Sequence, residues 1–422
     1  ETGRSLHMDK MELEEGDPEN HAFSFMSERK DRNKRNCWLT YTNEKTHEII
    51  RENIMRAPKY AGKIHGIGAR YCPSIEDKVV RFADKDRHQL FVEPEGLDTT
   101  EMYVQGMSTS MPIDVQYAFL RTIPGFEDVK MMRPAYAIEY DLLDPLQLYP
   151  TLEVIKLPGL YSAGQSNGTS GYEEAAAQGL VAGINAALKI QGKDPFILAR
   201  HEAYIGSLVD DLVTKGADEP YRMMTSRSEY RLILRQDNAD LRLTEKGHSI
   251  GLVGEERYAR FLERKKKYEE AMDYIRTQRF TPKEEINRAL ESMGTAPLTT
   301  GTGADQILKR PEMTYRKMME TLGCPAFDEE AVEEMEITVK YEGYIARQEA
   351  AVRKAARMEN EKLPLDMDYL SLDGISTEAR QKMDKIRPFS LGQAARIPGV
   401  SPADISVLMV YVKQRKGKKG AE

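Results

Sequence analysis

The stretch Leu160-Tyr-Ser-Ala-Gly164-Gln-Ser-Asn-Gly168-Thr-Ser-Gly171-Tyr-Glu-Glu-Ala-Ala-Ala-Gln-Gly179 decides the fold class of this sequence. Its apolar start predicts a short strand at residues 160–163, its glycines predict a tight loop, and the alanine-rich residues predict a helix from about residue 173 to residue 189. A strand, a glycine loop and a helix in this order are typical of a nucleotide-binding α/β domain. As a bare pattern, the same loop is equally typical of a plain tight turn.

On the N-terminal side of this stretch, residues 37–150 mix short apolar runs with turn signals. The runs at residues 89–93 and 136–140 predict strands, and residues 42–56 predict a helix. This part of the chain therefore indicates a strand-rich layer with helices between the strands.

On the C-terminal side, the pattern becomes helical from about residue 195. Apolar residues recur at helical spacing in residues 255–276, and residues 329–360 form a second long helical stretch. A helix pair, 391–397 and 402–412, is predicted around the turn Pro398-Gly399-Val400, with Ser401 as N-cap and Asp404 completing a box-like start. The predicted fold class is α/β followed by all-α, with a partial Rossmann-type domain that carries an inserted strand-rich segment.

The composition of the chain limits the classes of function that it can have. A net charge of −7 does not mark a nucleic-acid binder, although the basic tail at residues 413–419 provides a local cationic surface or a merely solubilising end. No apolar run approaches the roughly 18 residues of a membrane helix. The cysteines at 37, 72 and 324 match no zinc spacing, and such sparse thiols favour a reducing cytoplasm.

Two further motifs carry chemistry. Cys72 lies between Arg70 and Lys78 in sequence, and nearby cations lower the pKa of a thiol, which suits a nucleophile or an acid/base group. From the residues alone, a buried structural cysteine is the favoured alternative. The second motif is a run of arginines interleaved with tyrosines, which suits phosphate contacts and base stacking but is also typical of a solvated salt-bridge network: Arg222, Arg227, Arg231, Arg235 and Arg242, with Tyr221 and Tyr230.

Together, these strings resemble the MnmG/GidA family. The resemblance rests on residues 70–78, 164–179 and 225–231, on their order and spacing, and on the shorter runs 42–47 and 339–345. It covers the chain from about residue 16 to residue 412. The family resemblance implies an enzyme that adds a carboxymethylaminomethyl group to C5 of the wobble uridine (U34) of tRNA.

The resemblance also implies cofactors, partners and site residues. The expected cofactors are FAD and NADH, with methylenetetrahydrofolate as one-carbon donor, and the expected partners are tRNA, a second copy in a homodimer and an MnmE-type GTPase. Gly164, Gln165 and Gly168 are expected at the FAD, Cys72 in catalysis, and residues 340–412 at the partner and tRNA. The segment expected at NAD comprises Gly68, Ala69, Arg70, Tyr71, Cys72, Pro73, Ser74, Ile75, Glu76, Asp77, Lys78, Val79, Val80, Arg81 and Phe82. The arginines proposed for tRNA are Arg222, Arg227, Arg231 and Arg235.

One departure from the family pattern stands out. Family members open with a Gly-x-Gly-x-x-Gly loop that binds the FAD pyrophosphate, and no such sextet occurs in this sequence. We therefore expect a fragment that lacks the first half of the FAD domain. Its expected parts are a loop remnant (1–36), an NAD-associated α/β segment (37–150), the end of the FAD domain (151–195), a helical domain (196–335), a partner- and tRNA-contact domain (336–412) and a basic tail (413–422). The alternative function is a catalytically inactive fragment that retains dimerisation and tRNA or partner binding.

A docking role is also expected for the helix pair at the C-terminus. Its turn would offer backbone amides to a phosphate, or its apolar face, formed by Ile405, Leu408 and Met409, would bind a partner. Closure of the domain's own core by the same face is the alternative.

Overall fold

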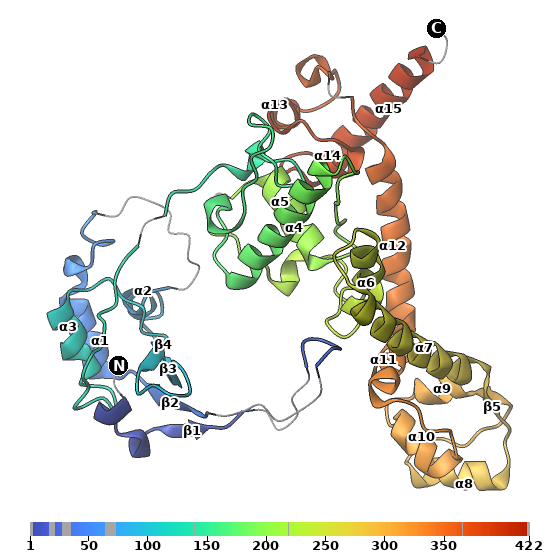
Figure 1. Cartoon of the computed structure of the whole chain (residues 1–422), viewed down its shortest axis with the longest axis horizontal. Helices are drawn as coiled ribbons and strands as arrows, with labels where there is room; N and C mark the ends of the chain where they lie inside the picture. Colours follow the sequence, from blue (N-terminus) through green and yellow to red (C-terminus); the bar gives the residue numbers. More distant parts are fainter. Residues whose placement is uncertain are drawn as a thin grey trace. The chain divides into compact units, whose positions relative to one another are not determined.

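The computed structural model describes residues 3–16, 22–27, 35–63, 73–138, 140–217, 219–364 and 366–419. The chain divides into two compact units (Figure 1). Unit 1 comprises Glu1–Pro145, Ser162–Leu180 and Ala217–Arg222, and unit 2 comprises Leu146–Tyr161, Val181–Gly216 and Met223–Glu422. Unit 1 combines a sheet with helices and unit 2 is mainly helical, which confirms the predicted class, α/β followed by all-α.

The sheet of unit 1 is antiparallel, with the strand order β1-β2-β3-β4. Its strands are β1 (Glu12–Glu14), β2 (Cys37–Tyr41), β3 (Gln89–Pro94) and β4 (Met102–Gln105). In its centre, Thr40 pairs with Leu90 and Trp38 with Val92. Leu90 and Val92 are fully buried and point to one side of β3, as the period of two requires. The strand predicted at residues 89–93 is confirmed by β3.

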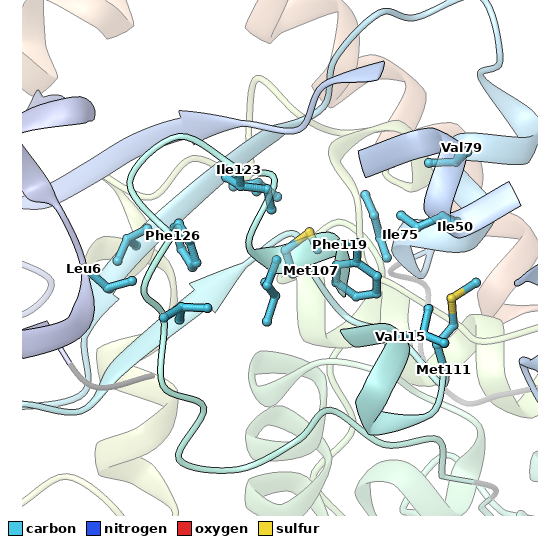
Figure 2. Packing of buried hydrophobic residues seen from close by; sticks show 14 of the residues in the cluster. Leu6, Ile50, Ile75, Val79, Met107, Met111, Val115, Phe119, Ile123 and Phe126 are labelled. Atoms are coloured by element: carbon cyan, nitrogen blue, oxygen red, sulfur yellow. The ribbon is translucent and has the colours of Figure 1, made fainter. Parts of the chain in front are cut away.

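Three helices and the strands β3 and β4 contribute to the core of unit 1, which Figure 2 shows. Helix α1 (Glu44–Glu52) begins with a capping box, because the Asn43 side chain accepts from the Thr46 N–H while the Thr46 hydroxyl accepts from the Asn43 N–H. Together with a short 3-10 turn at Ile54–Arg56, α1 confirms the helix predicted over residues 42–56. Helices α2 (Ile75–Arg81) and α3 (Ile113–Leu120) add Ile75, Val79 and Phe119, among others, to the core.

Two predicted strands do not form. At residues 160–163 the backbone makes only an isolated bridge between Tyr161 and Glu153, and residues 136–138 have no regular structure. A strand requires a neighbour that continues its ladder of hydrogen bonds, and in the described part of the chain residues 160–163 meet one only at Glu153 and Val154. The helix predicted from residue 173 to residue 189 does form, as α4 (Tyr172–Ile190).

Unit 2 contains two cores. The first is built by α7 (Glu255–Thr277), α8 (Glu284–Ser292), α9 (Ala304–Leu308), α10 (Tyr315–Leu322) and α11 (Glu329–Lys340), next to a two-stranded ribbon of β5 (Arg279–Phe280) and β6 (Thr302–Gly303). Helix α7 confirms the prediction for residues 255–276. The stretch 329–360 is helical but not continuous, because Tyr341, with φ −97° and ψ 6°, separates α11 from α12 (Glu342–Asn360).

The second core lies in the C-terminal bundle of α13 (Thr377–Ile386), α14 (Leu391–Arg396) and α15 (Pro402–Lys419). The predicted helix pair and its cap are confirmed, since the Ser401 hydroxyl accepts from the Asp404 N–H and the Asp404 carboxylate accepts from the Ser401 N–H. Ile405 and Leu408 are buried in this core, so the apolar face closes the bundle itself. The chain expected to form a separate tail continues as α15 up to Lys419.

The turn between α14 and α15 is not open to a phosphate. The Val400 N–H donates to the Ile397 carbonyl, and the Ser401 N–H is taken by Asp404. Beside Gly399, the Glu378 carboxylate is paired with Lys382 (2.7 Å), so the turn carries no uncompensated positive charge from this lysine. The phosphate-binding hairpin suggested by the sequence is therefore not supported by this geometry.

Among the described helices, none combines the length and the apolar character needed to span a membrane. The described residues also contain no cluster of His, Cys, Asp or Glu arranged to hold a metal ion.

Candidate functional site

The glycine loop of residues 164–171 is fixed by one buried side chain, Gln178 of α4. Its Oε1 accepts from the Gly164 N–H (3.1 Å) and from Asn167 Nδ2 (2.8 Å), and its Nε2 donates to Thr169 Oγ1 (3.0 Å). Gln178 and Asn167 are both fully buried. Buried amides are stable only when their polar atoms are paired, so this network ties the loop to the second turn of the helix that follows it.

Two glycines of the loop are required by its backbone. Gly164 and Gly168 have φ values of +84° and +79°, a region that other residues rarely adopt. A Cβ at Gly168 would also lie 2.8 Å from the Cβ of Ala217. The loop is therefore a built feature of unit 1 and not an incidental turn.

The hydrogen-bonding groups that the loop presents to a ligand do not come mainly from its glycines. The Gly164 N–H is occupied by Gln178, and the Gly168 N–H donates to the Gln165 carbonyl. The half-buried Gln165 side chain and the buried hydroxyl of Ser170 have no hydrogen-bond partner in the described part of the chain. These two groups suit a neutral, polar edge such as that of a flavin ring, by accepting and donating hydrogen bonds.

The start of α4 does not suit a phosphate. Glu173 and Glu174 lie in its first turn, and the Glu174 carboxylate folds back against Gly171. A carboxylate at a helix N-terminus already satisfies the positive end of the helix dipole. This end of the helix is therefore unsuited to holding the pyrophosphate of a dinucleotide.

The segment predicted to contact NAD is only partly described. Gly68, Ala69, Arg70, Tyr71 and Cys72 lie outside the described residues, and Pro73 and Ser74 lead into α2. Ser74 caps this helix by accepting from the Asp77 N–H (3.2 Å). On α2, Ile75, Glu76, Asp77 and Val79 are buried, whereas Val80, Arg81 and Phe82 are exposed.

The buried acids of α2 serve the fold. Glu76 accepts from the backbone N–H and the hydroxyl of Ser110. Asp77 accepts from Lys59 Nζ (2.8 Å) and from the Tyr60 hydroxyl (3.0 Å). Burial alone would raise the pKa of Asp77, but the bonds from Lys59 and Tyr60 outweigh it and hold that pKa below its usual value. Burial and Asp77 raise the pKa of Tyr60 to about 12.

The arginines proposed for tRNA fall into two groups. Arg231 is exposed, and Arg222 and Arg227 are half-buried. Arg235 is only 15% exposed and forms ion pairs with Asp237 and Glu334. Arg242, which belongs to the same run, donates to the carbonyls of Glu202 and Arg235. The guanidinium groups of Arg235 and Arg242 are thus committed to internal contacts.

The raised pKa of Glu334, the partner of Arg235, predicts that the stability of the fold depends on pH. Burial, together with the Asp237 carboxylate, raises the pKa of Glu334 from 4.5 to about 8, although Arg235 acts in the opposite direction. Because the folded pKa is the higher one, the protonated form stabilises the fold fully below about pH 4.5, and this contribution is lost as the pH rises through 8. The lowered pKa of Asp237 acts only below 3.8, outside this window.

We therefore expect the thermal midpoint of the wild-type chain to fall more between pH 5 and pH 8 than that of Glu334→Gln, by roughly a few degrees. Calorimetry at the two pH values measures the difference. Glu333→Gln, one residue away and exposed, is the matched control and should follow the wild type. Identical pH profiles for wild type and Glu334→Gln would contradict the prediction.

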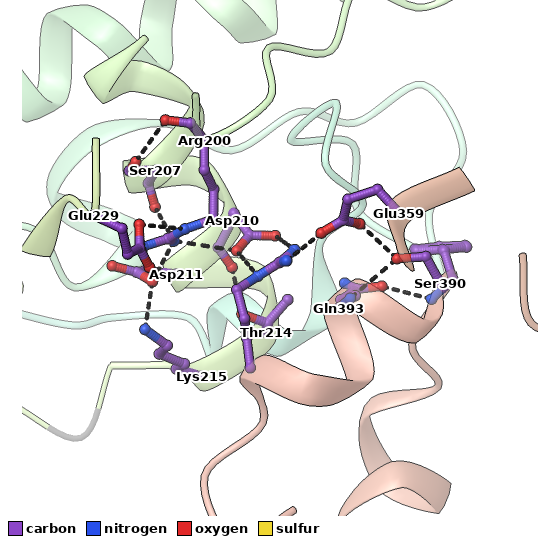
Figure 3. A network of polar contacts seen from close by, with 12 residues as sticks. Arg200, Ser207, Asp210, Asp211, Thr214, Lys215, Glu229, Glu359, Ser390 and Gln393 are labelled. Atoms are coloured by element: carbon purple, nitrogen blue, oxygen red, sulfur yellow. Dashed lines mark hydrogen bonds and ion pairs between the residues drawn. The ribbon is translucent and has the colours of Figure 1, made fainter. Parts of the chain in front are cut away.

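A cluster of ion pairs in unit 2, shown in Figure 3, joins segments far apart in sequence. We call it the arginine clasp; it consists of Arg200, Asp210, Asp211, Glu229, Glu359 and Arg396. Arg200 is 7% exposed and donates to Asp211 (2.7 Å), Asp210 (3.2 Å) and Glu229 (2.9 Å). Burial would lower the pKa of Arg200, but these carboxylates outweigh it and hold that pKa above its usual range.

Arg396 completes the clasp from α14. Its guanidinium donates two bonds to Asp210 (2.7 and 2.8 Å), which lies on α5 (Tyr204–Lys215), and it also pairs with Glu359 of α12. Glu359 in turn accepts from the Ser390 hydroxyl (2.6 Å). One carboxylate, Asp210, is thus shared by two arginines and links α5 to the C-terminal bundle. Sequence reasoning missed the clasp, because no spacing along the chain signals a pairing between Arg200, Asp210 and Arg396.

Family comparisons match most of the chain. Residues 2–194 match the family described as glucose inhibited division protein A. Residues 255–349 match the C-terminal helical domain of the tRNA modifying enzyme MnmG/GidA, and residues 351–422 match its C-terminal helical bundle.

Individual proteins agree with these matches. The chain is 55% identical, over 99% of its length, to the tRNA uridine 5-carboxymethylaminomethyl modification enzyme MnmG of Caldicellulosiruptor saccharolyticus, of which it covers 67%. It is 56% identical to the enzyme of the same name from Clostridium kluyveri, of which it covers 66%. The solved structure of Aquifex aeolicus GidA (form II crystal) superposes with a TM-score of 0.85 at 45% identity, covering 97% of this chain and 65% of that one. The chain thus spans about two-thirds of the length of these proteins.

Proposed function

The chain belongs to the MnmG/GidA family of tRNA-modifying enzymes, and from this premise we propose that it acts in adding a carboxymethylaminomethyl group to C5 of the wobble uridine of tRNA. The observation that carries the proposal is the loop of residues 164–171, held rigid by Gln178 and offering Gln165 and Ser170 to a ligand. The names of the relatives supply the modification itself.

FAD is the proposed cofactor at this loop, and when bound it would supply hydride transfer from NADH. Gln165 would hold the polar edge of the flavin and Ser170 would add a hydrogen bond, while Gly164 and Gly168 provide the backbone shape. The carboxylates at the start of α4 exclude the pyrophosphate from this end. The proposed NADH contact falls to the exposed residues at the end of α2, Val80 and Arg81, and to Phe82, which follows the helix.

Cys72 is the proposed catalytic residue. Its thiolate would add to C6 of the uridine or move a proton at C5, and the one-carbon unit would come from methylenetetrahydrofolate. Both roles require an ionised or polarisable sulfur, which Arg70 and Lys78 favour by their charge. The described member of this pair, Lys78, donates from its Nζ to the Gly106 carbonyl (3.1 Å).

The proposed partners are tRNA, a second copy of the chain and an MnmE-type GTPase, in the cytoplasm. Arg222, Arg227 and Arg231 are the proposed phosphate contacts. Arg235 belongs to the same run, and its internal ion pairs favour a role in positioning the other arginines.

The proposal is tested with a chimaera in which the third of the Caldicellulosiruptor saccharolyticus relative that this chain does not match is fused to the chain. The chimaera is incubated with unmodified tRNA, FAD, NADH, methylenetetrahydrofolate, glycine or ammonium, and an MnmE-type GTPase with GTP. Nucleosides from the digested tRNA are separated, and their masses are measured by mass spectrometry. We expect the mass of a carboxymethylaminomethyl or aminomethyl uridine, and unmodified uridine throughout would refute the proposal.

A related prediction concerns the chain alone. We expect the purified chain to bind FAD weakly or not at all, because it has no Gly-x-Gly-x-x-Gly loop and its α4 end carries carboxylates. Absorbance near the flavin bands after gel filtration measures this, with the chimaera as positive control. A stoichiometric yellow complex of the chain would contradict the prediction, whereas a colourless chain that binds tRNA is what an inactive binding module would also give.

A further inference from the structure

Unit 2 contains a cavity of about 860 Å³ that lies outside the glycine loop. It is lined by residues near Tyr149, by the end of α4, by α5 and by the C-terminal bundle, and the arginine clasp contributes Arg200, Asp210, Glu359 and Arg396 to its wall. Cavities of roughly 300–1,000 Å³ hold small ligands or single groups of larger ones. The size therefore suits one nucleotide with room to spare.

The charges that line the cavity are not balanced. Each of its three lining carboxylates is already paired: Glu153 with Lys189, Asp210 with Arg200 and Arg396, and Glu359 with Arg396. Two exposed lysines, Lys193 and Lys362, also line the cavity, and within the described residues neither has an acidic partner. Among the lining side chains, Lys193 and Lys362 therefore carry positive charge that no described lining carboxylate neutralises, which favours an anionic ligand beside them.

The same cavity presents aromatic rings. Tyr149 and Phe389 line it with ring centroids 6.1 Å apart and planes tilted by 42°, and Tyr230 lies edge-on to His201 at 6.2 Å. Flat aromatic side chains are the surfaces on which unstacked nucleobases bind.

The backbone holds the lysines near these rings. Lys362 forms an isolated antiparallel bridge with Ser390, and the N–H of the next residue, Leu363, donates to the Phe389 carbonyl (2.9 Å). Lys193 is fixed at the end of α4, where its N–H donates to the Leu188 carbonyl (2.9 Å). The backbone of Lys362 is therefore held beside that of Phe389. Lys193 contributes the second cation of the cavity wall from a different segment.

We propose that this cavity binds an unstacked nucleotide of the RNA substrate, with its base against Tyr149 or Phe389 and its flanking phosphates at Lys193 and Lys362. The inference rests on the proposed tRNA substrate and adds a recognition site to it. A peptide ligand is less well matched, because an acidic peptide would use the lysines but not the flat rings. A free anion would use the lysines and leave most of the cavity empty.

The test measures binding of a fluorescently labelled, unmodified tRNA transcript to the full chain over a range of salt concentrations. The cavity variant is Lys193→Ala with Lys362→Ala. Its matched control is Lys266→Ala with Lys283→Ala, which removes the same charge from exposed positions of unit 2 that do not line the cavity. A third protein, Phe389→Leu, keeps an apolar side chain and removes the ring.

We expect the cavity variant to bind about tenfold more weakly than the control and to lower the slope of log Kd against log salt by about 1 to 2. Phe389→Leu should bind roughly five- to tenfold more weakly with an unchanged slope, which separates stacking from charge. Tyr149 or Phe389 should carry the cross-link when 4-thiouridine-labelled tRNA is irradiated on the wild-type chain.

Equal affinity and slope for the cavity variant and its control, with tRNA bound by the wild type, would overturn the cavity proposal and leave the proposed function standing. Cross-links confined to other segments would do the same. Failure of the wild-type chain to bind the transcript at all would count against both.

Discussion

Replacing Gln178 with leucine is expected to destabilise unit 1 by about 2 kcal/mol, because the change leaves the Gly164 N–H without its partner. It also removes one bond each from Asn167 and Thr169, which keep their bonds to Ser162 and to the Gly164 carbonyl. The Gly164 N–H, the Asn167 amide and the Thr169 hydroxyl all bond to this one side chain. Each unsatisfied buried group costs about 1–3 kcal/mol, and leucine has nearly the volume of glutamine, so no cavity term is added.

Amide hydrogen exchange of the loop and of the first turns of α4 measures this effect locally, which avoids assuming a single unfolding transition for a two-unit chain. Gln191→Leu is the matched control, because Gln191 is an exposed residue just beyond the same helix. The control should stay within about 0.5 kcal/mol of the wild type. Loop protection equal to wild type in Gln178→Leu would show that the network does not hold the loop.

Cys72→Ser in the chimaera is expected to reduce tRNA modification at least about a hundredfold while leaving the flavin content unchanged. A thiol with a pKa near 8.5 is ionised to a few per cent at neutral pH even without help, whereas a serine hydroxyl is essentially never ionised there. The rate of modified-nucleoside formation under single-turnover conditions measures the loss, and absorbance at the flavin bands measures the cofactor content.

The other cysteines of the chain provide the controls. Cys324 is buried, and burial raises the pKa of its thiol. Burial and the nearby carboxylates of Glu93 and Glu14 raise the pKa of Cys37. Neither sulfur is activated, so Cys37→Ser and Cys324→Ser should modify tRNA at close to the wild-type rate. A Cys72→Ser protein as active as these two would make Cys72 a structural residue.

Helices were the part of the fold most readily predicted from sequence. The apolar spacing of α7 and the alanine-rich composition of α4 are properties of a single segment, and both helices end within a residue or two of the expected positions. Residues 160–163 have an equally apolar sequence, yet they form only a bridge at Tyr161. Strand formation depends on a partner elsewhere in the chain, which a local pattern does not contain.

The candidate site likewise has parts that could be predicted from the sequence and parts that could not. The glycine loop was found because its residues are consecutive, and Gln178 could have been found with it, since an amide among the alanines of the helix that follows the loop signals a buried polar contact. The arginine run was ambiguous, and the contacts made by Arg235 depend on Glu334, which belongs to a helix far along the chain. The clasp and the cavity depend wholly on such distant pairings.

Because Arg200 and Arg396 share Asp210, these three positions cannot be substituted independently during evolution. Loss of either arginine leaves the carboxylate half-compensated, and loss of the carboxylate removes the group that both guanidiniums share, while Arg200 keeps Asp211 and Glu229 and Arg396 keeps Glu359. Single substitutions at these positions are therefore destabilising, and an exchange of all three for apolar residues would take the arginines away from Asp211, Glu229 and Glu359 as well. Among homologous proteins, α5 and α14 should consequently change together at this point or remain unchanged.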